Sequence, residues 1–452
     1  MSAGGAPHVG RAIEPARGPV HAVIRVPGSK SLSNRHIVLA GLAALADGSV
    51  LLRGALACDD CDRLLAALEA FGVRHERDGD LLRIERGPVP LSATVDLGDG
   101  GTPTRFMIAF AAAQPHGVFT IDGSARMRER PVAEGVDLLR ALGARIEYVE
   151  EDGRLPVRVF GGGCTGGSIE VGRTASSQFV SAAMLVAPRL ARGLEIRFTA
   201  EPTSASYIHL SLAALAAAGV QAEVGYGPVV LGAAQPGAGL ARVSIAPQPI
   251  PAGSVEIEPD ASSAVYPAAA AVLTGGEVVL AGLPRRSAQP DSHFLDDLAL
   301  RGARVEELSD GRGTCVKAGA RLRALDADYA RAPDAAVMAM VLAACGDGPS
   351  RFTGLGTLRV KESDRIEAVA AGLRALGGTV ETGGDWVRVH PLPAQPTPAT
   401  IDTVNDHRIA MAFAVLGLAR PGVSIRNPDC VRKSWPGFWD ALDALCCENR
   451  PR

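Results

Sequence analysis

Apolar and polar residues follow a pattern that recurs five times along the chain. Each copy starts with a stretch whose apolar residues lie three or four positions apart, ends that stretch at a glycine, and continues as two short alternating segments separated by a turn. Each copy therefore predicts a helix followed by a strand hairpin. We expect each glycine to end its helix with a positive φ, which glycine adopts without strain. The glycines are Gly72, Gly143, Gly219, Gly302 and Gly377.

A second pattern, a short apolar strand followed by a polar loop, occurs six times and precedes the helices. It occupies residues 48–62, 117–131, 193–207, 276–291, 350–365 and 422–436. Six copies of about 75 residues account for the whole chain, and this period is too long for a solenoid repeat. The pattern predicts an α/β protein in which a duplicated unit packs its strands and helices as α+β layers.

Length and composition agree with a soluble globular protein. The chain has 452 residues, of which 47% are hydrophobic and 21% are charged, and this length suggests about two to four domains. The best candidate for a membrane span, residues 409–418, is about half as long as a bilayer requires. The N-terminal segment also lacks the apolar core of a signal peptide. We therefore expect a cytoplasmic protein with no membrane partner.

Charge and cysteine spacing exclude further classes of protein. The 46 Lys and Arg residues are balanced by 49 Asp and Glu residues, a formal charge of −3 that argues against a nucleic-acid partner. The eight cysteines are too scattered for a disulfide scaffold. Cys58 and Cys61 form a C-x-x-C, but no second ligand pair lies within metal-ligand spacing. A G-x-G-x-x-G spacing occurs at residues 161–166 but does not lie between a strand and a helix, so we expect neither a metal nor a dinucleotide.

Three of the six polar loops are basic. Lysines and arginines that recur at equivalent loop positions of a globally acidic chain indicate a site for a small polyanion, although isolated surface charges are common. The basic residues are Arg126, Arg128, Arg130, Arg359, Lys361, Arg365, Arg432 and Lys433.

Two predicted helices begin with groups that suit an anion. Lys30 and Arg35 lie in the first turns of the helix within residues 26–45. Ser176, Ser177 and Gln178 open another, where hydroxyl groups and free backbone N–H groups can hold a phosphate. The alternative for the serines is an ordinary helix cap.

Carboxylates beside cations form a candidate acid–base group. Glu362 adjoins Lys361 just before a helix whose start is predicted by Asp364 and Glu367. Asp334 occupies a similar helix start in another copy of the repeat. Such carboxylates can serve as a general acid or base, or simply cap a helix or form a surface ion pair.

Two further helix starts complete the candidates. Asp406, His407 and Arg408 precede an apolar helix, and the turn at Gly101 leads into a helix that contains Arg105. Both could instead be ordinary helix caps and turns. Together the segments indicate an enzyme for a small substrate with more than one anionic group.

Seven motifs, in this order over about 400 residues, carry a family resemblance. They are PGSKSLSNR, GGTPTR, RMRERP, SSQF, PDAA, RVKESDR and NDHR. The chain resembles the 5-enolpyruvylshikimate-3-phosphate (EPSP) synthases, the 3-phosphoshikimate 1-carboxyvinyltransferases. The related UDP-N-acetylglucosamine enolpyruvyl transferases have a different N-terminal lysine motif and fit less well.

The resemblance implies a two-domain inside-out α/β barrel built from six βαβαββ repeats, three per domain. Domain one would span residues 28–256, and domain two would combine residues 1–27 with residues 257–452. The active site would lie in the cleft between the domains, which close on the substrate.

The resemblance also implies a reaction. The enolpyruvyl group of phosphoenolpyruvate would be transferred to the 5-hydroxyl of shikimate 3-phosphate, with release of phosphate, in the shikimate pathway of chorismate and aromatic amino acid biosynthesis. The partners would be these two small substrates, no metal or organic cofactor would be needed, and we expect a monomer.

Site residues follow from the resemblance by motif. Catalysis would use Lys30, Asp334, Glu362 and His407, with Asp334 accepting the 5-hydroxyl proton and Glu362 protonating the methylene carbon. Shikimate 3-phosphate would bind Lys30, Ser31, Arg35, Ser176, Ser177, Gln178, Ser204, Tyr207, Asp334 and Lys361. Phosphoenolpyruvate would bind Lys30, Gly101, Arg126, Gln178, Arg365, Arg408 and Lys433.

Two positions depart from the family pattern. The chain has Asp99 and Thr357 where the family commonly has Asn. A carboxylate at Asp99 would repel an anionic substrate unless it is paired or points away. This leaves a paralogue acting on a related cyclic alcohol as an alternative. A noncatalytic anion-binding relative is a second, but binding alone would not need Asp334 and Glu362 besides Lys30.

Overall fold

The computed structural model of the chain describes residues 10–88, 90–228 and 238–447. Residues 1–9, part of the N-terminal segment behind the cytoplasmic expectation, lie outside the described residues. The chain divides into two compact units. We call Gly28–Glu258 the central unit, and the segments up to Pro27 and from Pro259 onward the terminal unit.

The central unit contains three four-stranded sheets of identical pattern. In each sheet the first two strands are parallel and the other two join antiparallel. The first sheet has the order β14 (Gly253–Glu256), β3 (Val50–Arg53), β5 (Leu81–Arg86), β4 (Val73–Asp78). The second has the order β6 (Ser92–Asp96), β7 (Val118–Asp122), β9 (Val157–Phe160), β8 (Arg145–Tyr148). The third has the order β10 (Gly167–Val171), β11 (Leu194–Phe198), β13 (Ala238–Ile245), β12 (Glu223–Pro228).

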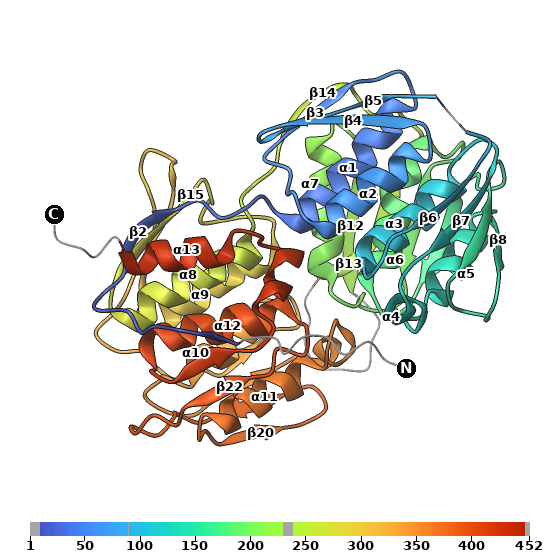
Figure 1. Ribbon diagram of the computed structural model, residues 1–452. Helices are drawn as coiled ribbons and strands as arrows, with labels where there is room; N and C mark the ends of the chain where they lie inside the picture. Colours follow the sequence, from blue (N-terminus) through green and yellow to red (C-terminus); the bar gives the residue numbers. More distant parts are fainter. Residues whose placement is uncertain (1–9, 89, 229–237, 448–452) are drawn as a thin grey trace, which may run out of the picture. The chain divides into compact units, whose positions relative to one another are not determined.

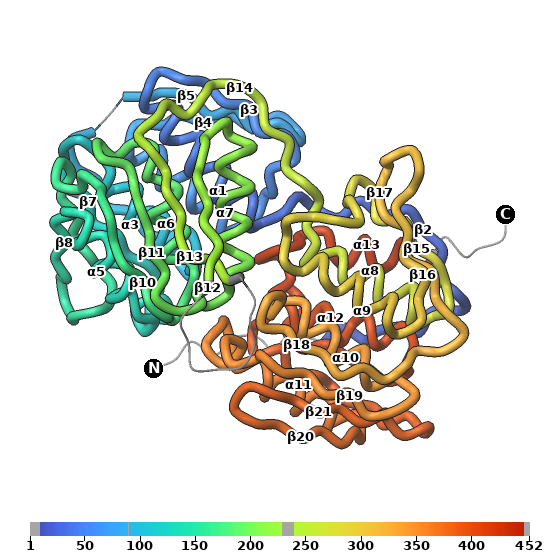
Figure 2. Tube along the Cα trace, turned by 180° about the vertical axis from the view of Figure 1, so that it is seen from behind, coloured from blue at the N-terminus to red at the C-terminus, as the bar shows by residue number. Residues whose placement is uncertain are grey.

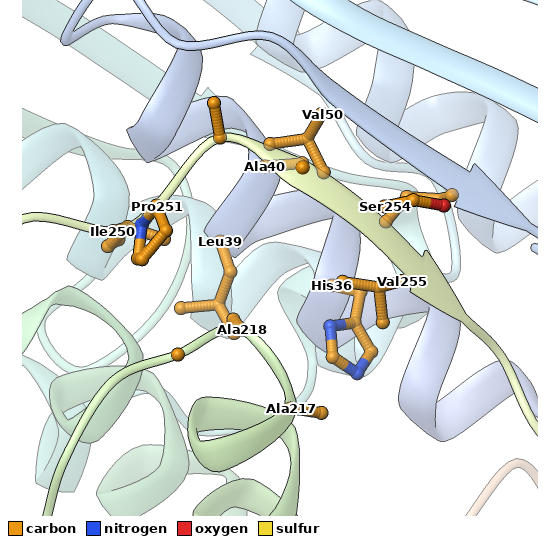
Figure 3. Close-up of a pocket in the computed structure, with 14 residues that line it drawn as sticks. His36, Leu39, Ala40, Val50, Ala217, Ala218, Ile250, Pro251, Ser254 and Val255 are labelled. Atoms are coloured by element: carbon orange, nitrogen blue, oxygen red, sulfur yellow. The ribbon is translucent and has the colours of Figure 1, made fainter.

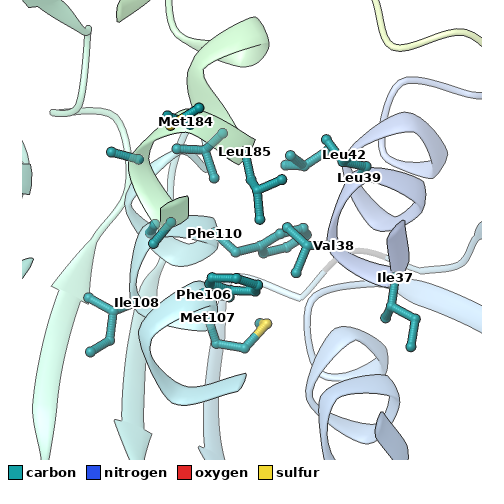
Figure 4. Packing of buried hydrophobic residues seen from close by; sticks show 14 of the residues in the cluster. Ile37, Val38, Leu39, Leu42, Phe106, Met107, Ile108, Phe110, Met184 and Leu185 are labelled. Carbon is teal, nitrogen blue, oxygen red and sulfur yellow. The ribbon is translucent and has the colours of Figure 1, made fainter. Parts of the chain in front are cut away.

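Helices fill the middle of the central unit, and its sheets lie at the periphery (Figures 1 and 2). Helices α1, α3 and α6 are buried on nearly every side, as helices surrounded by other elements are. Their side chains pack around Phe106 and Phe110 (Figure 4). The helices are α1 (Lys30–Ala44), α2 (Asp59–Glu69), α3 (Gly101–Ala112), α4 (Ala125–Arg128), α5 (Ala133–Ala141), α6 (Ser177–Val186) and α7 (Ala205–Ala217).

The terminal unit repeats the same sheet pattern. Two sheets are four-stranded: β2 (His21–Ile24), β15 (Glu277–Ala281), β17 (Gly313–Lys317), β16 (Arg304–Glu307), and β18 (Ala327–Asp328), β19 (Ser350–Thr353), β21 (Val387–Val389), β20 (Val380–Thr382). The third has three strands, β22 (Ala399–Ile401), β23 (Val423–Ile425) and β1 (Arg11–Ala12). Again one parallel pair is extended by antiparallel strands.

The helices of the terminal unit are α8 (Ala261–Thr274), α9 (His293–Leu300), α10 (Ala336–Ala343), α11 (Arg365–Ala375), α12 (His407–Ala419) and α13 (Phe438–Cys447). The residues of α12 are almost all buried, and α8, α10 and α11 pack against it. Short 3₁₀ turns η2 (Pro290–Ser292), η3 (Gly356–Val360) and η4 (Pro428–Lys433) lie in the polar loops, and η1 (Ala187–Arg189) follows α6 in the central unit. None of the described helices combines the length and the hydropathy that a membrane crossing requires.

The glycines that end the repeated helices behave as predicted. All five have positive φ, between 78° and 105°. The prediction from the hydrophobic pattern is thereby confirmed, and the mixed α/β class agrees with it. The seven cysteines whose side chains are described are free thiols; the side chain of Cys447 lies outside the described residues.

The chain passes between the units twice, and the two connections are hydrogen-bonded side by side. The Ser29 amide donates to the Glu258 carbonyl, and the Asp260 amide donates to the Pro27 carbonyl, both at 2.8 Å. At Gly28 a Cβ atom would lie 1.8 Å from the Gly54 carbonyl oxygen, so only glycine fits this connection.

Candidate functional site

A buried arginine organises the cluster of site residues in the terminal unit. Arg365, the first residue of α11, donates from Nη1 to Asp334 and from Nη2 to Glu362, each at 2.8 Å. Its Nε donates to Asp406 at 2.8 Å. The Arg365 side chain is 1% exposed. One guanidinium thus joins three carboxylates that are far apart in the sequence.

Further cations surround these carboxylates. Arg408 donates to the second oxygen of Asp334 at 3.0 Å, and Lys361 Nζ lies 3.5 Å from the first. Lys433 Nζ lies 3.6 Å from Glu362. The structure therefore brings together seven of the predicted residues: Asp334, Lys361, Glu362, Arg365, His407, Arg408 and Lys433.

The electrostatics of this cluster favour negative charge. Burial alone would raise the pKa of Asp334, but Arg408, Lys361 and Arg365 outweigh it and hold that pKa well below its usual range. Burial likewise opposes charge on Arg365, but its carboxylate partners raise its pKa overall. Both groups are therefore charged at neutral pH.

The loop before α12 is shaped by two residues in the left-handed region. Val404 and Asn405 have φ of 45° and 58°, and Asn427, just before η4, has φ of 51°. Asn427 donates its side-chain amide to Asn405 at 2.8 Å, which links the two loops. Backbone strain of this kind is often maintained where side chains must be aimed at a site.

Asp406 caps α12 and also accepts a hydrogen bond from Arg365. It accepts from the Arg408 amide at 2.9 Å and from the Ser363 hydroxyl at 3.0 Å. His407 follows it, with a side chain 1% exposed and Nδ1 3.9 Å from Asp406 Oδ1. The predicted cap is present, and its carboxylate has a second role.

Asp291 is a component that sequence reasoning missed. This buried carboxylate in η2 accepts from the Ser262 hydroxyl and, at 3.2 Å, from the Ala335 amide directly after Asp334. Burial and the neighbouring charge of Asp334 raise the pKa of Asp291 to about 6. Asp291 therefore fixes the backbone that carries Asp334. Its only sequence signal was a position in a polar loop.

Arg35 ties three helices of the central unit together. Its Nε donates to Ser211 at 2.9 Å, and its Nη2 donates to Ser181 at 3.4 Å and to the Tyr207 carbonyl at 3.1 Å. Its Nη1 donates to the Ser31 carbonyl at 2.9 Å. Burial lowers the pKa of Arg35 to about 10, so it stays charged. Most of its N–H groups hold α1, α6 and α7 in place.

Lys30, the first residue of α1, forms an ion pair with Asp60 at the start of α2. The Nζ–Oδ2 distance is 3.0 Å, and the side chains are 18% and 9% exposed. Sequence reasoning did not assign Asp60 to the site, because its partner lies thirty residues earlier. The pair positions the Lys30 ammonium group.

The starts of α6 and α3 are adjacent. Gln178 donates to the Thr102 hydroxyl at 2.9 Å, while its buried Oε1 accepts from no described residue. Ser176 caps α6 by accepting from the Gln178 amide at 3.2 Å, and Ser177 is buried beside it. The Gln178 acceptor is thus available to a ligand.

Gly101 lies against two arginines. A Cβ atom there would be 2.5 Å from Nη1 of Arg130 and 3.0 Å from Nη1 of Arg105. Arg126 of the same basic loop is mostly exposed and forms an ion pair with Glu129. The structure therefore places Arg130 beside the Gly101 turn, although the sequence had pointed to Arg126.

Several helix N-termini converge in each unit. In the central unit these contacts join the starts of α1, α2, α3, α6 and α7. In the terminal unit they join those of α8, α10, α11 and α12. Each N-terminus carries about half a positive charge, so both clusters suit anions. Among the described residues, no three His, Cys, Asp or Glu side chains are placed so that they could hold a metal ion together.

Comparison with known proteins identifies the family. The family model of EPSP synthase (3-phosphoshikimate 1-carboxyvinyltransferase) matches residues 15–442, a span that includes both clusters. The chain belongs to the EPSP synthase family. The family and enzyme class predicted from the seven motifs are thereby confirmed, and the chain is a transferase of aromatic amino acid biosynthesis.

Relatives in this family are similar over nearly their whole length. A 3-phosphoshikimate 1-carboxyvinyltransferase from Shewanella denitrificans is 38% identical over 434 residues, 94% of this chain and 96% of that protein. One from Shewanella sediminis is 36% identical over 433 residues, 94% and 97% of the two chains. A solved EPSP synthase from Acinetobacter baumannii has a TM-score of 0.77 at 25% identity, covering 96% and 98%.

The two departures from the EPSP synthase pattern have defined surroundings. The Asp99 carboxylate accepts a hydrogen bond from the hydroxyl of Ser124, the cap of α4. The hydroxyl is a neutral donor, so it orients this carboxylate without cancelling its negative charge. The Thr357 hydroxyl in η3 is buried and bonds to no described residue; nothing in the structure explains that substitution.

Ser204 and Tyr207 lie at the start of α7. Ser204 has φ of 51° and adopts the left-handed conformation without capping the helix through its side chain. Its carbonyl accepts from the Tyr207 amide at 2.9 Å. A left-handed backbone at a residue other than glycine is often maintained close to a functional site.

Proposed function

We propose that the two clusters act on one pair of substrates, transferring the enolpyruvyl group of phosphoenolpyruvate to the 5-hydroxyl of shikimate 3-phosphate. The observation that carries the residue assignment is the Arg365 hub, which holds Asp334 and Glu362 together among Lys361, Arg408 and Lys433. Anion binding alone requires the cations but not two carboxylates at the centre.

In the first step the 5-hydroxyl oxygen adds to C2 of phosphoenolpyruvate. Asp334, assisted by Lys30, accepts the hydroxyl proton, and Glu362 gives a proton to C3, which yields a tetrahedral intermediate. In the second step the C–O bond to phosphate breaks and C3 loses a proton, which forms the enol ether. Cationic residues stabilise the departing phosphate. His407, in the first turn of α12, would act as a supporting hydrogen-bond donor.

The low pKa of Asp334 fits this role once substrate is present. In the free protein Arg408, Lys361 and Arg365 hold the pKa of Asp334 below its usual range, which makes it a weak base. Anionic substrates on the same cations would offset their charge and raise that pKa. The base would therefore strengthen when both substrates are bound.

Shikimate 3-phosphate would be held mainly at the helix N-termini of the central unit. The 3-phosphate would contact Ser176, Ser177 and Ser204, with Lys361 from the terminal unit. The unbonded Oε1 of Gln178 would accept a ring hydroxyl. The ring and carboxylate would be completed by Lys30, Ser31, Arg35, Tyr207 and Asp334.

Phosphoenolpyruvate would bind Lys30, Gln178, the Gly101 backbone and the cations Arg365, Arg408 and Lys433. We assign Arg130 to this group in preference to Arg126, because Arg130 lies against Gly101 whereas Arg126 is exposed and paired with Glu129.

We propose that the active site lies between two domains that close on the substrates. The domains would correspond to the two units, each an inside-out barrel of three βαβαββ repeats, as the shared sheet pattern supports. We further propose that the enzyme is a cytoplasmic monomer that needs no metal or organic cofactor.

Steady-state release of phosphate from phosphoenolpyruvate, with and without shikimate 3-phosphate, tests the assignment. Glu362→Gln and Asp334→Asn should each lower kcat by well over tenfold while the thermal midpoint stays near that of the parent. Glu367→Gln on the exposed side of α11 is the matched control and should leave kcat unchanged. Near-parental turnover in either site variant would remove that residue from the chemistry. Turnover only with another cyclic alcohol would indicate the paralogue.

A further inference from the structure

A pocket of about 180 Å³ opens in the central unit between the middle of α1 and the far end of α7, two helices that carry site residues. It is bounded by the middle of α1, the C-terminal end of α7, strand β3 and the segment that leads into β14 (Figure 3). Tyr207 lies near the N-terminus of α7 and Ala218 follows its C-terminus, about 16 Å further along the axis. The pocket is therefore distinct from the substrate cluster.

The pocket lining is apolar and uncharged. Leu39, Ala40 and Leu52 form buried parts of the wall, while Ala218 and Val255 lie nearer to the surface. No Lys, Arg, Asp or Glu is among the described residues that line it. A ligand that carries a charge would lose its hydration here without gaining an ion pair.

His36 and Ser254 supply the polar side chains of this otherwise apolar wall. His36 is 3% exposed, and it is one of the residues that line the pocket. Burial, with the charge of Arg35, lowers the pKa of His36 to about 4, so the ring is neutral near pH 7. A neutral imidazole offers one donor and one acceptor, which a ligand in the pocket can use.

We propose that this pocket binds a small neutral ring compound that carries one hydroxyl or N–H group, with the ring in the apolar space and the polar group hydrogen-bonded to His36. The size supports a single ring, because an apolar cavity of about 150 Å³ in another protein accommodates benzene. The uncharged lining selects against the anionic substrates of the family.

Titration of the whole protein with phenol, followed by NMR of the histidine rings, tests the proposal. The chain has nine histidines, and His36→Leu identifies the His36 signals. Phenol should shift these signals saturably, with a dissociation constant in the millimolar range or tighter. Nuclear Overhauser effects should join the phenol ring to the methyl groups of Leu39 and Val255. No saturable shift up to the solubility limit would overturn the proposal.

Variants and related probes make the test specific. Ala218→Leu should fill the pocket and weaken phenol at least tenfold, whereas Ala216→Leu, exposed on the same helix and outside the pocket, should not. His36→Leu should weaken phenol at least fivefold but leave benzene unaffected. Benzoate binding as tightly as phenol, competitive displacement of phenol by shikimate 3-phosphate, or binding insensitive to Ala218→Leu would each contradict the proposal. The Overhauser contacts decide the matter if Ala218→Leu does not fold.

Discussion

Arg365 shows how one residue can hold a set of like charges together. It contacts Asp334, Glu362 and Asp406, which would repel one another without it. With Arg408, Lys361 and Lys433 the cluster contains four cations and three carboxylates in mutual contact. Asp291 adds a fourth carboxylate that is mostly ionised above its pKa of about 6, so the four cations are balanced by four carboxylates at neutral pH.

Replacing Arg365 should be among the most destabilising single changes in the terminal unit. Arg365→Met leaves three carboxylates without their shared partner, and breaking a buried ion pair in this way costs about 3–5 kcal/mol. Urea unfolding followed by circular dichroism measures the effect. Arg374→Met, which breaks an exposed pair with Glu367 on the same helix, should cost about 1 kcal/mol or less. Equal losses of unfolding free energy in the two variants would show that Arg365 does not hold the three carboxylates together.

Asp291 should give the free energy of unfolding a recognisable pH dependence. Its folded pKa of about 6 lies above the unfolded value of about 3.9, so the native state binds the extra proton. Stability from this group is present below the unfolded pKa and is lost as the pH rises through the folded pKa. The stability of Asp291→Asn relative to the parent should therefore rise by about 1–3 kcal/mol from pH 4 to pH 7. A difference that stays constant with pH would refute the raised pKa.

Elements were predictable where the determining residues are near one another in the sequence. The helix ends at the five glycines and the cap at Asp364, which accepts from the Glu367 amide at 3.1 Å, follow from local pattern alone. Asp60 and Asp291 were missed because their partners lie tens of residues away, and Arg130 was named only as one cation of a basic loop. The packing of the basic loop decides which of its arginines lies against Gly101. This packing cannot be predicted from the residue types alone.

The connection at Gly28 should tolerate no side chain. In Gly28→Ala the new Cβ would meet the Gly54 carbonyl, so the start of α1 must shift. We expect a loss of about 2 kcal/mol or more in unfolding free energy and a raised KM for shikimate 3-phosphate, since Lys30 and Ser31 follow directly. Gly384→Ala, at a position with open space, is the control. A Gly28→Ala protein with parental stability and KM would contradict this account of the connection.

At the scale of the whole molecule, the proposal requires the two units to approach each other when substrates bind. Small-angle X-ray scattering of the slow Glu362→Gln variant should show a smaller radius of gyration with saturating shikimate 3-phosphate and phosphoenolpyruvate than without ligands. Shikimate, which lacks the phosphate, should have a weaker effect at the same concentration. An unchanged radius at saturation would argue against closure of the units around the substrates.

The central claim is that the chain joins phosphoenolpyruvate to shikimate 3-phosphate, and ³¹P NMR of the complete reaction tests it most directly. The account predicts that the phosphoenolpyruvate signal disappears only when shikimate 3-phosphate is present. It also predicts equal amounts of inorganic phosphate and of a new phosphate ester, the enolpyruvyl product. Consumption of phosphoenolpyruvate at the same rate without shikimate 3-phosphate, or no consumption with both substrates, would contradict it.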